Sequence, residues 1–234
     1  MVNREGPNGG WIVFDPIRDT SLARFVEVAR PSVVMKENCY WICVRGRDRR
    51  EARYTRGEDY SSYNEVLESQ QALANLVAKK KEAPQAVAKL LKIAEERGEV
   101  SGKWLLMAKG SENVDEMWRR VGISCGELKL GVAAKISPYG GNNGTGRAAV
   151  CCVYVENFTD RKELRRVCVE IRAVLGFDEG EGEGEGEGEK VEKVEECWNV
   201  GFKPDVFTRL GIESNNVWGL PATTHKEKEV LEWV

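Results

Sequence analysis

The sequence has little of what marks a membrane, secreted or metal-binding protein. No apolar run approaches the roughly 18–20 residues that span a bilayer, and the first ten residues lack the apolar segment of a signal peptide. The seven cysteines form no CxxC pair, and the chain has one histidine, His225. Because most of the cysteines lie in apolar runs, we interpret them as buried thiols of a reducing compartment. We therefore expect a cytoplasmic or nuclear protein that has no metal, cofactor or membrane partner.

Charge and length set further bounds. The formal net charge is −3 with 31% charged residues, so the chain as a whole does not favour nucleic acid or membranes. No Pro/Gly/Ser linker divides the 234 residues, and we expect one domain over residues 1–234 that is monomeric. The acidic tract EGEGEGEGEGE at 179–189 consists of glycines, which are flexible, and glutamates, which repel one another, and both oppose an ordered structure. We therefore predict a mobile insertion over 177–196. Residues 1–10 are expected to be a disordered tail.

The centre of the predicted fold is the segment 127–137, ELKLGVAAKIS. Its apolar residues alternate with Lys129, Lys135 and small residues, so it predicts a strand with one apolar face and one face that carries two lysines. These lysines are either solvated on a half-buried antiparallel strand or available to an anionic ligand. The glycine-rich loop 137–147 matches no nucleotide-binding spacing, so we interpret it as a hairpin connection to the apolar run 148–155.

A second candidate site is a basic loop. Arginine among tyrosines can bind phosphate while the rings stack on bases, as in single-stranded nucleic-acid sites. The alternative is a solvated loop whose charges partly pair with one another. The residues concerned are Arg45, Arg47, Arg49, Arg50, Arg53, Tyr54 and Arg56.

The order of predicted elements gives the fold class. Strands are expected at 11–14, 40–44, 102–108, 127–137 and 148–155, with a closing strand pair at 203–212 and 217–221. Helices are expected to begin near Thr20, Ser62, Pro84, Asn113 and Thr159. This order is typical of an α+β domain, here a curved antiparallel sheet with its helices packed on one face.

Five motifs resemble the basophilic leukemia-expressed protein family over about residues 36–225: GKWLLM at 102–107, VDEMW at 114–118, LKLGVAAKIS at 128–137, VCCVYVENFTDRKELRRV at 150–167 and KPDVFTRLGI at 203–212. The resemblance implies a fold similar to translation initiation factor 4E, with helices on the convex side and a ligand slot on the concave side. That factor holds methylated guanine between two tryptophans, whereas residues 46–102 contain none. The cations that the resemblance places near the slot are Lys103, Lys135, Arg147, Lys203 and Arg209.

The order Lys103, Lys135, Arg147 is also similar to bacterial phosphothreonine lyases. That resemblance implies Lys135 as the base and Lys103 with Arg147 as the phosphate clamp. The histidine that would act as general acid is Leu105 here, and His225 is expected in a tail, so the rate should be about 10²–10⁴-fold lower.

The hypothesis that these patterns favour is a non-enzymatic protein that binds a phosphate-bearing ligand, RNA or a nucleotide, on the concave face of its sheet. The alternatives are a phosphothreonine-lyase-like enzyme and an adaptor that docks a protein partner on its helical face.

Overall fold

The computed structural model describes residues 3–5, 10–14, 19, 21–37, 39–46, 60–75, 79–140, 148–176 and 200–233. The predicted insertion over 177–196, the basic loop beyond Gly46 and the loop residue Arg147 therefore lie outside the described residues. The elements are β1 Asn3–Glu5, β2 Trp11–Phe14, α1 Leu22–Val28, β3 Trp41–Arg45, α2 Ser61–Asn75, α3 Lys79–Glu96, β4 Gly102–Ala108, α4 Ser111–Gly126, β5 Ala133–Ile136, β6 Ala149–Val155, α5 Arg161–Leu175, β7 Gly201–Pro204, α6 Asp205–Arg209, β8 His225–Lys226 and α7 Glu227–Leu231.

The strands form one sheet in the order β1-β2-β3-β5-β6-β4-β7-β8, which confirms the α+β class. The prediction of a wholly antiparallel sheet is wrong for one pair, because β2 and β3 run parallel. Parallel neighbours need a crossover connection, and the chain through α1 supplies it between Phe14 and Trp41. The predicted disordered tail over 1–10 contains a strand, since β1 pairs with β2.

One face of the sheet carries the main core. Trp104 and Leu106 of β4 and Val153 of β6 are fully buried against Trp118 of α4 and Ile171 of α5. Helices α1, α4, α5 and α7 all contribute to this cluster, as the sequence predicted for helices on one face. The local signals in α5 are strong, because Asp160 caps its first turn and Gly176 ends it in the left-handed conformation.

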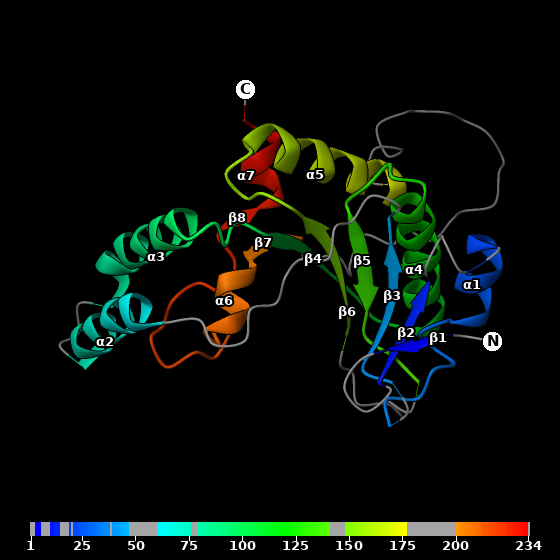
Figure 1. Cartoon of the computed structure of the whole chain (residues 1–234), viewed down its shortest axis with the longest axis horizontal. Coiled ribbons are helices and arrows are strands. Elements are labelled where there is room, and N and C mark those ends of the chain that lie inside the picture. Colours follow the sequence, from blue (N-terminus) through cyan, green and yellow to red (C-terminus); the bar gives the residue numbers. More distant parts are fainter. Residues whose placement is uncertain are drawn as a thin grey trace, which may run out of the picture.

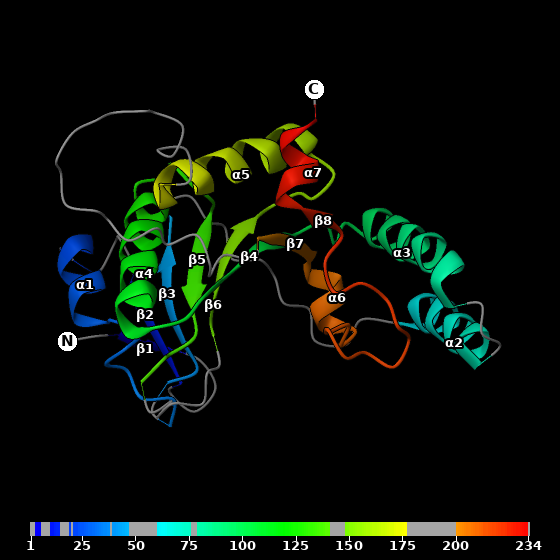
Figure 2. The same ribbon diagram turned by 180° about the vertical axis from the view of Figure 1, so that it is seen from behind.

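The hairpin of α2 and α3 does not join this layer. Its buried residues Tyr63 and Leu90 pack with Phe207 of α6 and with Ile212 in a second cluster, and Phe158 contacts both clusters. Figures 1 and 2 show the hairpin at one end of the molecule beyond α6, and α1 at the opposite end. The prediction that the helices pack on one face of the sheet is therefore wrong for α2, α3 and α6.

The predicted strand over 127–137 is shorter in the structure. Helix α4 continues to Gly126, and Leu128 then adopts a left-handed φ of 63°. The backbone N–H of Lys129 donates to the carbonyl of Ser124 at 3.0 Å, which closes the end of the helix. The alternating pattern before Ala133 thus belongs to a helix end and a turn. Of the two predicted lysines, only Lys135 lies on the sheet.

The predicted closing strand pair is also different. Pro204 ends β7, and Asp205 begins α6 directly after it. Besides β4, the strand that pairs with β7 is β8, at His225 and Lys226, and residues 217–221 contain a turn at Val217 and Trp218 and no strand. His225 is therefore part of the sheet and is not in a tail.

Candidate functional site

The candidate site lies on the second face of the sheet, opposite α1, α4, α5 and α7. Cross-strand partners share a face, and side chains alternate along each strand. From β2 to β7, each of six neighbouring strands places at least one aromatic or cationic side chain on this second face. In that order the side chains, which we call the ring–lysine row, are Trp11, Trp41, Lys135, Tyr154, Lys103 and Lys203.

Lys135 lies among three rings at the centre of this row. Its Nζ is 4.0 Å from the ring centroid of Trp41, 5.4 Å from that of Trp11 and 5.5 Å from that of Tyr154. These separations are within the range of cation–π attraction. Within the described part of the chain, no carboxylate forms an ion pair with this ammonium. Burial lowers the pKa of Lys135, and the charge of Lys103 lowers it further.

Lys103 is partnered from two sides. Its Nζ donates to Asp205 Oδ1 at 2.6 Å and to Thr208 Oγ1 at 2.8 Å, and it lies 5.6 Å from the centroid of the Tyr154 ring. Asp205 also accepts a hydrogen bond of 2.7 Å from the hydroxyl of Ser101. The side chain of Lys103 therefore shares the face and the Tyr154 ring with Lys135, but its charge is already compensated.

The other predicted cations are paired or lie elsewhere. Lys203 is on the second face with its Nζ 3.0 Å from Glu213 Oε1. Arg209 is on α6 and not on a strand of the sheet, and its Nη1 lies 3.0 Å from Glu99 Oε2. Lys129 pairs with Glu127 in the turn after α4. Of the predicted cations that the structure describes, Lys103, Lys135 and Lys203 share the second face of the sheet.

The predicted basic loop is described only at its first residue. Arg45 ends β3 and lies on the same face as Cys43, opposite Ala133 of β5. The remaining arginines and Tyr54 lie outside the described residues.

Three site residues, Trp11, Trp41 and Tyr154, were not predicted. The two tryptophans each begin a strand, and the alternation within WIVF and WICV places both on the face of Cys43. The alternating pattern of these two strands could therefore have predicted that both tryptophans lie on this face. What the sequence did not reveal is that β3 lies directly beside β5, which puts Trp41 over Lys135.

The histidine is on the other side of the sheet. His225 pairs with Phe202, which in turn pairs with Trp104 on the helix-covered face. Its Nδ1 lies 3.1 Å from Glu229 Oε1, and its ring contacts Trp233. It cannot protonate a leaving group beside Lys135, so the described residues supply no histidine for a lyase reaction.

Other site types find no support in the described ranges. None of their helices has both the length and the apolar character that a bilayer span requires. They also contain no group of three or more His, Cys, Asp or Glu side chains arranged to hold a metal ion.

Residues 58–177, just over half of the chain, match the family model described as basophilic leukemia-expressed protein Bles03. The matched segment contains Lys103, Lys135 and Tyr154, whereas Trp11, Trp41 and Lys203 lie outside it.

Proposed function

The chain belongs to the basophilic leukemia-expressed protein Bles03 family, and we propose that it binds single-stranded RNA or a nucleotide on the second face of its sheet without catalysing a reaction. The observation that carries this proposal is the Lys135 ammonium, which has three aromatic rings around it and no carboxylate within ion-pair distance among the described residues. Sites for single strands combine rings on which bases stack with cations that attract the backbone.

The dimensions of the ring–lysine row suit such a ligand. Neighbouring strands lie about 4.8 Å apart, so six strands from β2 to β7 span about 24 Å. Trp11 and Trp41 are each partly exposed, which leaves ring area for a base. The rings lie toward β2 and the two further lysines toward β7, so a ligand is expected to place bases at the first end and phosphates at the second.

The test is fluorescence anisotropy of a labelled single-stranded oligonucleotide at several salt concentrations. We expect Lys135→Gln to weaken binding about tenfold, the worth of one charge-assisted contact. The slope of log affinity against log salt should fall by about 0.7, as expected when one phosphate contact is lost from a single strand. Lys129→Gln is the matched control, because it removes the same charge from an exposed lysine in the turn.

Two further variants separate stacking from charge. Trp41→Leu should weaken binding by about 1–3 kcal/mol with little change in the salt slope, because it removes a stacking ring and no charge. Because burial lowers the pKa of Lys135, binding should weaken with rising pH before ordinary lysines deprotonate near 10.5, and Lys135→Arg should remove this loss. If Lys135→Gln and Trp41→Leu both bind like the parent, the proposal is wrong.

A further inference from the structure

Two buried lysines lie directly opposite each other at the β7 end of the ring–lysine row. Lys103 of β4 and Lys203 of β7 are cross-strand partners, and their side chains are only 8% and 4% exposed. Like charges in this position repel, and each buried ammonium needs an anionic partner. The structure supplies one carboxylate to each.

The two carboxylates differ in how firmly they are held. Asp205 follows β7 directly and is held by two hydrogen bonds to Ser101. Its carboxylate accepts one from the Ser101 hydroxyl, and its backbone N–H donates the other to the Ser101 carbonyl at 2.9 Å. Glu213 lies after α6, and its side chain is 67% exposed. Its contact with Lys203 Nζ at 3.0 Å is its one side-chain interaction among the described residues, and the same holds for the Lys203 ammonium.

We infer that Lys103 and Lys203 form a phosphate subsite, that the carboxylate of Glu213 fills it in this structure, and that a terminal phosphate of the ligand displaces Glu213. The exposed Glu213 carboxylate regains its hydration when it leaves, whereas the Lys203 ammonium, which is buried, requires another anion in its place. A buried ammonium left behind then attracts a phosphate monoester, whose charge is close to −2 at neutral pH. Asp205 stays in place and continues to compensate Lys103.

This inference rests on the proposed function for the identity of the ligand. The distance between Lys135 and Lys203 is compatible with such a ligand. Lys135 on β5 and Lys203 on β7 are three strand spacings apart, about 14 Å. A base that stacks at the rings and a terminal phosphate of the same short strand can reach both positions. The ligand class is therefore a single strand or nucleotide with a terminal phosphate.

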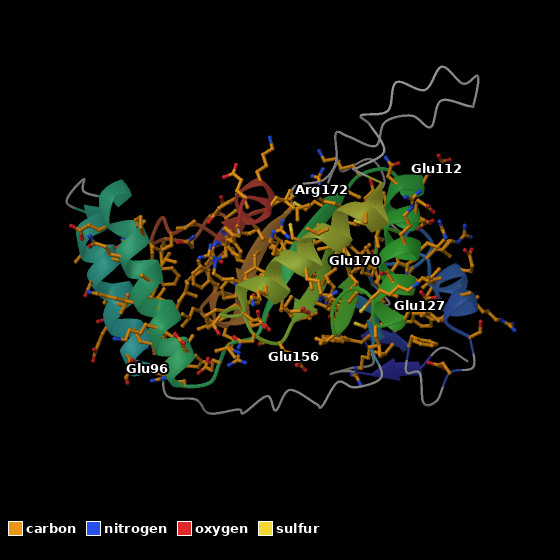
Figure 3. All side chains as sticks on the ribbon, turned by 90° about the horizontal axis from the view of Figure 1, so that it is seen from above. Glu96, Glu112, Glu127, Glu156, Glu170 and Arg172 are labelled. Carbon is orange, nitrogen blue, oxygen red and sulfur yellow. The ribbon has the colours of Figure 1, made fainter. Side chains whose placement is uncertain are left out.

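The first experiment uses inorganic phosphate and the full chain. Backbone amide shifts of β7 are followed by NMR during titration with phosphate, with chloride at the same ionic strength as the reference. We expect saturable shifts, and in Glu213→Gln about fivefold tighter binding, because the competing carboxylate is gone. Glu127→Gln is the control: it removes one charge from another exposed ion pair, at the end of α4 and away from β7 (Figure 3).

Two results would overturn the inference: no saturable phosphate binding in either the parent or Glu213→Gln, or equal affinity in both. Lys203→Met should abolish the β7 shifts. Should this variant fail to fold, the comparison of Glu213→Gln with Glu127→Gln decides alone.

The second experiment compares short single strands that carry a 5′-phosphate, a 3′-phosphate or no terminal phosphate. A preference for one phosphorylated form that grows in Glu213→Gln supports the inference. RNA binding that depends on Lys135 but shows no such preference overturns the subsite and leaves the proposed function standing. Phosphate binding without any binding of RNA or of a nucleotide has the opposite meaning: the proposed function fails and the subsite stands.

Discussion

Removal of the Asp205 carboxylate tests whether the lysine pair of the second face is truly buried. In Asp205→Ala the Lys103 ammonium loses its partner at 2.6 Å and keeps only Thr208, in a position where the lysine side chain is 8% exposed. An ammonium left unpaired in such a place costs about 3–5 kcal/mol of folding free energy. Since small domains are stable by only about 5–15 kcal/mol, this is a large part of the total.

The second variant in this cycle is Lys103→Met, which removes the charge and keeps most of the apolar volume. Asp205 in that variant retains the Ser101 hydroxyl, and its side chain is 20% exposed, so the cost should be smaller than that of Asp205→Ala. The double variant contains neither charge. We expect it to recover about 2 kcal/mol relative to the sum of the single variants, which is the size of coupling found for contacting residues.

Urea unfolding followed by tryptophan fluorescence measures these free energies, because Trp104 lies next to Lys103 in β4. Glu127→Ala is the control for an exposed ion pair, since Glu127 is 47% exposed and its loss should cost at most about 1 kcal/mol. A loss below about 1 kcal/mol in Asp205→Ala, or additive effects in the cycle, would refute the buried pair on which the phosphate subsite depends.

Three further predictions concern pH, reactivity and packing. Hydrogen bonds from Arg119, and then from Arg120, lower the pKa of Glu116 from 4.5 to about 2. In acid unfolding scans the parent should therefore lose stability between these two pH values more steeply than the variant Glu116→Gln does. Burial raises the pKa of the Cys43 thiol to about 12, so iodoacetamide at pH 8 should label it only after denaturation, as read by peptide mass spectrometry; labelling in the native protein would contradict its burial. A Cβ at Gly131 would lie 2.4 Å from the carbonyl oxygen of Tyr154, so Gly131→Ala should lower the unfolding free energy by about 1–3 kcal/mol. An unchanged free energy of urea unfolding in this variant would contradict this packing.

The parts of the fold that the sequence predicted well are those whose signals are local. β4 matches its predicted bounds, and α5 ends at Gly176 and begins one residue later than predicted, with Asp160 instead of Thr159 as its cap. The predicted strand over 127–137 failed because an alternating pattern does not distinguish a strand from a helix end, and the left-handed Leu128 was not visible in it. The α2–α3 hairpin has an amphipathic pattern like the other helices, but the pattern does not say which surface covers the apolar side.

The candidate site was predictable only in part for the same reason. The period of two put Lys135 on the correct face, and the resemblance added Lys103 and Lys203. The position of Trp41 depends on strand order, because β3 and β5 are neighbours although α2, α3, β4 and α4 lie between them in the chain. Partners such as Glu213 for Lys203 and Glu99 for Arg209 depend on tertiary contacts that residue types do not encode.

The different surroundings of the lysines explain why they are expected to act in sequence on one ligand. A carboxylate cancels the charge of an ammonium, whereas an aromatic ring stabilises the ammonium through its quadrupole and leaves the full charge in place. Lys135 therefore attracts a phosphate without losing a partner, while Lys203 must first exchange Glu213. A nucleic acid should thus engage the rings and Lys135 first, and the high local concentration of its terminal phosphate then favours the exchange at Lys203. On this argument free phosphate should bind Lys203 more weakly than the phosphate of an oligonucleotide already held at Lys135, and Lys135→Gln should reduce the difference.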